Sequence, residues 1–153
     1  MIRFETAQTI ARSADEIWTY AVDVLRHPEW MAVTDARILQ GQGSEVGARG
    51  RERLMLGPFR WDVEFVVTQA TPGRRIVWRS VAGAPFYGDI ALDLTPIGAD
   101  TTRATYGASV QMRGLWRLLA PLIAMEGKAG QARELQRLKE QVEGVPAIAP
   151  AVA

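Results

Sequence analysis

The chain has 153 residues, of which 48% are hydrophobic and 23% are charged, a balance typical of a globular protein. This length supports one domain with a substantial core and is too short for two ordinary domains. The net charge of +1 argues against a dedicated nucleic-acid-binding domain, and the absence of cysteine excludes disulfide scaffolds and thiolate metal sites.

The sequence shows no targeting or membrane-spanning signal. Its first residues, "MIRFETAQTIARS", lack the basic segment followed by an apolar segment that marks a signal peptide. No run of about twenty apolar residues occurs, so we expect no transmembrane helix. We therefore expect a cytoplasmic protein.

The N-terminal region predicts a strand followed by two short helices. Apolar and polar residues alternate over residues 1–12, as in a half-buried strand. Ser13 and Glu16 form a capping box that begins a helix. This helix must end before Pro28, because proline disfavours the helical conformation at the residue before it. Residues 27–31, "HPEWM", predict a second short helix or a turn.

The rest of the chain predicts six strands and then a long helix. The strand segments are residues 36–41, 47–56, 59–70, 75–82, 86–97 and 102–112. The turns between them are short, which favours an antiparallel meander over alternating strands and helices. Residues 115–144 carry one apolar stripe at helical spacing. At about 1.5 Å per residue this helix is roughly 45 Å long, enough to cross a whole sheet.

The stretch "RERLMLGPFRWDVEF", residues 51–65, predicts a hairpin that turns at Gly57-Pro58. In this register one face carries two pairs of opposite charges, Arg51 with Glu64 and Arg53 with Asp62. We expect these charges, together with Arg49, to face solvent. The other face sets Glu52 among apolar residues. Either that face encloses something other than packed core, or Glu52 lies near an open end of the sheet.

This order of elements resembles the START-like (SRPBCC) superfamily, specifically its bacterial polyketide cyclase/dehydrase-like branch. The matching stretches are "SADEIWTYAVDVLRHPEWM", "EVGARGRERLMLGPFRWDVEFVVTQATPGRRIVWRS" and "MRGLWRLLAPLIAMEGKAGQARELQRLKEQVE". The resemblance implies an α+β helix-grip fold, in which a curved seven-stranded antiparallel sheet wraps around the C-terminal helix and leaves a cavity. We expect one domain at residues 1–144 and a flexible Pro/Ala-rich tail at residues 145–153.

In this family the cavity commonly holds a hydrophobic small molecule, such as a lipid, sterol, quinone, aromatic polyketide or plant hormone. The inward-facing positions then become candidate ligand-binding residues: Leu54, Trp61, Val63, Phe65, Trp78, Ser80, Phe86, Ile90, Leu92, Tyr106, Leu119 and Ile123, with Trp30 at the cavity mouth. Large inward aromatic residues equally suit an ordinary core. The motifs are specific for the fold and do not identify the ligand.

Glu52 and Tyr106 are the candidate acid/base residues, because both fall on the inward face. Glu52 would anchor a ligand or act as a general base, or it would lie near a strand end and reach solvent or pair with an arginine. Tyr106 would orient a polar group of the ligand, or pack its ring and bond to the backbone. Glu126 is a further candidate whose direction is open. His27, the sole histidine, precedes Pro28 and is expected to be a surface or capping residue.

Three functions fit these residues. The first is a non-catalytic binder or carrier of a hydrophobic, ring-containing molecule such as a lipid, quinone or polyketide. The second is a cyclase or dehydratase that uses Glu52 and Tyr106. The third is a protein-interaction module with a vestigial cavity. We favour the first, because an enzyme would place more ionisable groups on the inward face.

The expected partner is a small molecule rather than a nucleic acid, and no cofactor or metal is expected. A single histidine without cysteine does not suit a transition-metal site. The segment "RGLWRLLAPLIAM" is amphipathic and would touch a membrane transiently, or it would pack on the sheet as an ordinary helix start. Both a monomer and a homodimer are compatible with the sequence.

Overall fold

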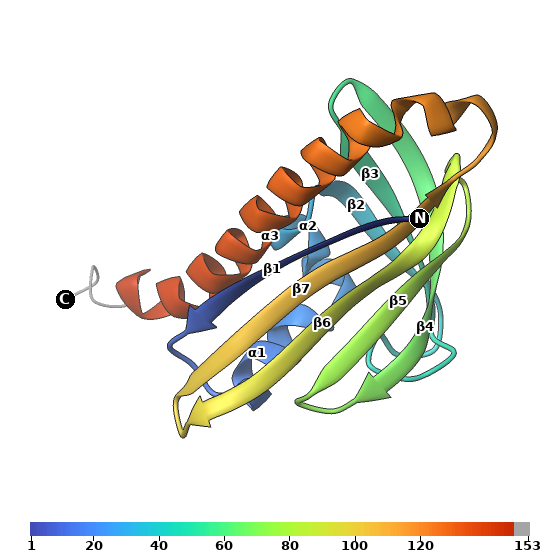
Figure 1. Cartoon of the computed structure of the whole chain (residues 1–153). Coiled ribbons are helices and arrows are strands. Elements are labelled where there is room, and N and C mark those ends of the chain that lie inside the picture. The colour runs from blue at the N-terminus through green and yellow to red at the C-terminus, as the bar shows by residue number, and fades with distance from the viewer. Residues whose placement is uncertain (149–153) are drawn as a thin grey trace.

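The computed structural model describes residues 1–148, with side chains through residue 144. A seven-stranded antiparallel sheet curves around one long helix (Figure 1). Its strands are β1 (Ile2–Ile10), β2 (Val33–Gln40), β3 (Arg49–Leu56), β4 (Phe59–Thr71), β5 (Arg75–Ala82), β6 (Phe86–Gly98) and β7 (Thr101–Met112). They pair in the order β1-β7-β6-β5-β4-β3-β2. The predicted helix-grip architecture is therefore confirmed.

Three short helical segments follow β1, where the sequence predicts two. They are α1 (Ala14–Ala21), the 3-10 helix η1 (Val24–Arg26) and α2 (His27–Trp30). Ser13 is the N-cap of α1, as predicted, since the Glu16 amide donates to Ser13 Oγ at 3.2 Å. A second cap restarts the chain after α1, where the Leu25 amide donates to Asp23 Oδ1 at 3.1 Å. This early break turns α2 back toward the sheet.

The β3–β4 hairpin has the predicted register. Glu52 pairs with Val63, and Leu56 pairs with Phe59 beside the turn. The charged ladder lies on the solvent face, with ion pairs at 2.6 Å for Arg51–Glu64 and 3.0 Å for Arg53–Asp62. These exposed pairs specify the register more than they stabilise the fold. The hairpin therefore turns Glu52 to the inner face of the sheet.

The C-terminal helix begins later than the sequence predicts. Residues Gly114–Leu119 form the 3-10 helix η2, and the helix α3 runs over Ala120–Ile148. Pro121 lies at the junction, and its missing N–H suits the first turn of a helix. The backbone of residues 145–148, predicted as tail, continues α3, while residues 149–153 lie outside the described residues. Within residues 1–148, no helix is both long and apolar enough to cross a membrane.

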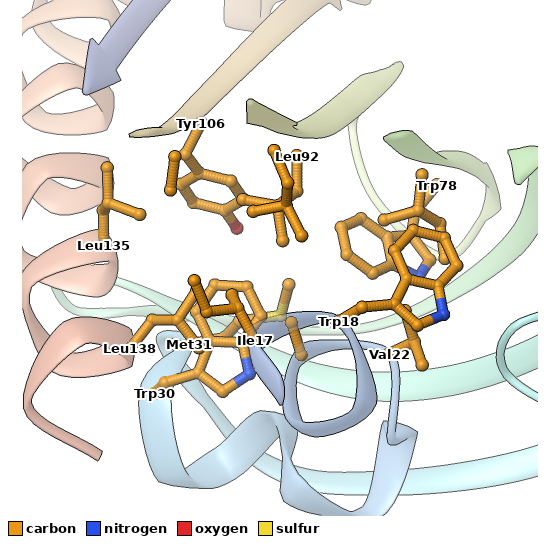
Figure 2. Packing of buried hydrophobic residues seen from close by; sticks show 14 of the residues in the cluster. Ile17, Trp18, Val22, Trp30, Met31, Trp78, Leu92, Tyr106, Leu135 and Leu138 are labelled. Carbon is orange, nitrogen blue, oxygen red and sulfur yellow. The ribbon is translucent and has the colours of Figure 1, made fainter. Parts of the chain in front are cut away.

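The dry core occupies one end of the space between α3 and the sheet (Figure 2). There α1 and α2 pack against both layers, and the space between the layers holds a continuous cluster of buried side chains. The largest hydrophobic members are Ile10, Ile17, Trp30, Ile76, Leu92, Tyr106, Leu135 and Leu138. Toward the β3–β4 turn no short helix intervenes between the sheet and the first half of α3 (Figure 1). The cavity described next extends toward that end.

Candidate functional site

A cavity of about 220 Å³ lies between the inner face of the sheet, α2 and the first half of α3. Small-molecule sites usually begin near about 300 Å³, so this one is small. It is still larger than the roughly 150 Å³ apolar cavity that accommodates benzene. Most of its walls are apolar side chains. Its size suits a compact molecule of about two fused rings.

Nine of the thirteen predicted ligand-binding residues line this cavity. They are Leu54, Val63, Phe65, Trp78, Ser80, Phe86, Ile90, Tyr106 and Ile123. The period of two along each strand predicts the inward face correctly for these strand residues. Ile123 reaches the cavity from the second turn of α3. The candidate acid/base residue Glu52 also lines it.

The other four predicted residues lie outside the cavity lining. Trp30 and Leu92 are fully buried in the dry core rather than at a cavity mouth or wall. Leu119 ends η2 and is 38% exposed, because the 3-10 turns rotate it away from the sheet. Trp61 belongs instead to an aromatic cluster.

This aromatic cluster connects the hairpin to η2. The Trp61 ring stacks on Phe59 at 5.6 Å between centroids and meets the edge of Trp116 at 5.7 Å. It also meets Phe86, a cavity-lining residue, at 5.8 Å. The Trp61 ring thus packs against other aromatic rings, one of which belongs to the cavity-lining residue Phe86.

Glu52 points inward and bonds to His27 rather than to an arginine. His27 is 1% exposed, so its expected surface position is wrong. The break after α1 and the restart at Asp23 lower α2 onto the inner face of the sheet. There His27 Nδ1 contacts Glu52 Oε1 directly. The sequence reasoning treated these two residues separately and so missed the pair.

Both nitrogens of the His27 ring face hydrogen-bond acceptors. Nε2 lies 3.1 Å from the carbonyl oxygen of Ala21, so it bears a proton and donates it. Nδ1 faces Glu52 Oε1, so a second proton lies between the imidazole and the carboxyl group. The rings of Trp30, Phe65 and Trp78 surround the imidazole at 5.9, 6.3 and 5.5 Å between centroids. His27 is therefore fixed, and its hydrogen bond to Glu52 uses only Oε1 of that carboxyl group.

A second buried pair, Tyr106 and Glu134, faces the same cavity. Glu134 Oε1 accepts the Ala32 amide at 2.8 Å, and the Tyr106 hydroxyl bonds to the same carboxyl group. Burial raises the pKa of Glu134 above its usual 4.5, and these hydrogen bonds oppose the shift. Burial and then Glu134 raise the pKa of Tyr106 well above its usual value.

Glu134 was missed although the sequence contained a signal for it. The apolar stripe of the C-terminal helix includes Leu135 and Leu138, and residue 134 lies on the edge of that stripe. Two more polar residues of α3, Gln131 and Arg133, also line the cavity, as does the earlier candidate Glu126. Glu126 and Arg133 are exposed, whereas Gln131 is buried.

Across the described residues, no group of three or more His, Cys, Asp or Glu side chains is arranged to hold a metal ion. Four of the ionisable residues that line the cavity instead form two pairs, His27 with Glu52 and Tyr106 with Glu134. One pair ties α2 to β3 and the other ties α3 to β7. This arrangement can donate and accept protons without a metal.

The raised pKa of Glu134 predicts a pH dependence of stability. The folded state favours the protonated carboxyl group, so this contribution is complete below about pH 4.5 and is lost as the pH rises through the folded-state value. The substitution Glu134→Gln removes this pH-dependent contribution. We expect the free energy of unfolding of the native protein, relative to that of the variant, to fall as the pH rises from about 4.5 through the folded-state pKa of Glu134. Urea unfolding of both proteins measures this difference, and a constant difference would contradict the assignment.

Comparison with known proteins agrees with this architecture. The sequence profile of the family described as "polyketide cyclase / dehydrase and lipid transport" matches residues 1–143. Comparison with curated protein sequences gives no match.

Solved structures with the same fold come from several bacteria. A START superfamily protein from Mycobacterium smegmatis has a TM-score of 0.82 at 16% identity, covering 95% of this chain and 99% of that one. An aromatase/cyclase from Streptomyces sp. R1128 has a TM-score of 0.76 at 15% identity, covering 92% and 93%. A protein from Thermus thermophilus has a TM-score of 0.78 at 16% identity, covering 94% and 98%. At these identities the likeness extends to the fold, and the profile match shows that the chain belongs to the polyketide cyclase/dehydrase and lipid transport family.

Proposed function

We propose that the protein binds a hydrophobic, ring-containing small molecule in the cavity between the sheet and α3 and acts as its carrier. The observation that supports this most is an apolar cavity into which a few polar groups converge. The family description includes lipid transport. A lipid fragment, a quinone or a polyketide-like ring system would suit the walls, and the volume favours the smaller members of these classes.

The hydrogen bonds already made by the buried polar groups support a carrier function. His27 has acceptors for both ring nitrogens, and Glu134 has the Ala32 amide and Tyr106 as donors. Because these groups are already paired, the cavity stays stable when ligand enters and leaves. Ligand affinity would come mainly from burying apolar surface against residues such as Phe65, Trp78 and Ile90.

A cyclase or dehydratase activity is the second candidate, and one observation favours it. The structure adds His27 and Glu134 to Glu52 and Tyr106 as ionisable groups at the cavity. The deprotonated Glu52 carboxylate would remove a proton from the carbon next to a ligand carbonyl. The Tyr106 hydroxyl would turn from Glu134 to hydrogen-bond to the oxygen of the resulting enolate, and return of the proton from Glu52 to carbon would complete the exchange.

One experiment with 2-tetralone, a neutral two-ring ketone, tests the binder and separates it from the enzyme. We expect the native protein to bind 2-tetralone and Ala108→Leu, which fills the cavity, to lose at least about tenfold in affinity. The matched control is Ala7→Leu, on the exposed face of the neighbouring strand β1, which should bind normally.

The same samples in deuterated buffer test for catalysis. The rate at which the hydrogens next to the carbonyl group of 2-tetralone exchange for deuterium is followed by NMR. A carrier leaves the exchange rate at the buffer value. An enzyme accelerates it and loses the acceleration in Glu52→Gln while keeping affinity. Equal affinities for the native protein and Ala108→Leu would count against both functions.

We further propose that η2 and the start of α3 contact a membrane surface when ligand is exchanged. The side chains of Leu115, Leu118, Leu122 and Met125 are 84%, 79%, 53% and 64% exposed, and η2 has no buried residue. An ordinary helix start packed on the sheet would bury several of them. Arg113 and Arg117 lie among them. Two copies joined through this face would bring like charges together, so an anionic bilayer suits it better than a second copy.

This surface predicts binding to vesicles of anionic phospholipid and weaker binding to neutral ones. The double variant Leu115→Ser, Leu118→Ser should reduce co-sedimentation with anionic vesicles by several-fold, because it removes the two most exposed apolar side chains of η2. Ile97→Ser, an exposed position on β6, is the matched control and should bind as the native protein does. Unchanged binding of the double variant would refute the contact, and concentration-dependent dimerisation lost in that variant would assign the face to a second copy.

A further inference from the structure

The side chain of Gln131 is a buried amide without a partner. It lies in α3, is 6% exposed and lines the cavity. Neither its nitrogen nor its oxygen has a hydrogen-bond partner among the described residues. Burying an unpaired amide is unfavourable, and most buried polar atoms in folded proteins are paired. Gln131 therefore offers two unused hydrogen-bonding groups inside the cavity.

Other polar groups of the cavity behave differently. His27 bonds to Glu52 and Ala21, Glu134 bonds to Ala32, and the Ser80 hydroxyl accepts the Gly88 amide at 2.9 Å. Trp78 is the exception, since its buried indole N–H also lacks a partner in the described part of the chain. Among the buried side-chain atoms of the cavity-lining residues, those without a partner in the described residues thus belong to Gln131 and Trp78.

The helix around Gln131 leaves room for a ligand beside it. Gly127 and Gly130, one turn and one residue earlier, both line the cavity and have no side chains to cover the amide. A Cβ on Gly127 would lie 2.6 Å from the Phe4 ring, so glycine lets α3 approach β1 closely here. The Gln131 side chain thus lines the cavity while its amide atoms are covered in this structure, so the amide would turn toward the cavity to pair with a ligand.

A carboxamide presents an N–H donor beside a C=O acceptor. The group that satisfies both presents an acceptor beside a donor, as a lactam, a primary amide or an enol next to a carbonyl does. A carboxylic acid has the same pattern only while it is protonated, because a carboxylate has no O–H to donate to the Gln131 oxygen. The complementary group is therefore neutral.

We propose that Gln131 determines ligand specificity, by pairing with a neutral fused-ring molecule that carries a hydrogen-bond donor next to a carbonyl group. This inference rests on the proposed binding function and adds the polar chemistry of the ligand. Apolar walls select little among rings of one size, whereas a buried amide left unpaired discriminates strongly against ligands that lack its complement.

Three ligands of nearly the same shape test this pairing: naphthalene has no polar group, quinoline has an acceptor, and 2-quinolinone has a donor beside a carbonyl. We expect the native protein to bind 2-quinolinone at least about tenfold more tightly than naphthalene, with quinoline between them. Gln131→Leu should remove this preference while still binding naphthalene. Gln136→Leu is the matched control, because Gln136 lies in the same helix, outside the cavity lining, and bonds to Gln8 and Glu140.

Stability gives an independent measurement on the same variants. Without ligand, Gln131→Leu should unfold at a higher urea concentration than the native protein, because it removes an unpaired buried amide, whereas Gln136→Leu loses hydrogen bonds. Equal native affinities for the three ligands, or a preference that survives in Gln131→Leu, would overturn the role of Gln131 and leave the binding function standing. Failure of the native protein to bind any of them would count against the binding function as well.

Discussion

The bond between His27 and Glu52 is the interaction on which the rest of the site depends. A buried carboxyl group without a partner would be costly, and so would a buried imidazole. Together they satisfy each other and tie the short helix α2 to β3. On the other side, Arg137 donates to the Trp30 carbonyl at 2.9 Å and Glu134 accepts the Ala32 amide, which tie the end of α2 to α3. Two helices and the sheet are thus joined by polar contacts around one end of the cavity.

These contacts separate a dry core from a cavity within one domain. On one side of them, Ile17, Trp30, Leu135 and Leu138 close the space between sheet and helix (Figure 2). On the other side, Gly127 and Gly130 of α3 bring no side chains into the space between the two layers, which stays open as the cavity. Charged groups at the boundary are paired, so ligand enters beside polar groups that are already stable.

Most of the fold, and about half of the site, follow from the sequence. Strand alternation predicts the register that turns Glu52 inward, and the capping box at Ser13 fixes the start of α1. The position of His27 depends on where α1 stops, which is decided by a second cap at Asp23 that local propensity signals weakly. Trp30 and Trp61 are large aromatic residues of the kind that also line cavities. Only the packing of the folded chain decides whether such a side chain lies in the core or at the cavity. Gln131 could not be identified as a site residue from the sequence, because whether its amide has a partner depends on all the side chains that surround it in the fold.

The most direct test is mass spectrometry of the small molecules released when the protein, purified from cells that express it naturally, is denatured. We expect a stoichiometric hydrophobic compound with a fused ring system and a neutral polar group, small enough for a cavity of about 220 Å³. Native mass spectrometry of the intact protein should also give a mass that exceeds the mass of the chain by the mass of that compound. A native mass equal to the bare chain, with nothing released above background, would contradict a carrier.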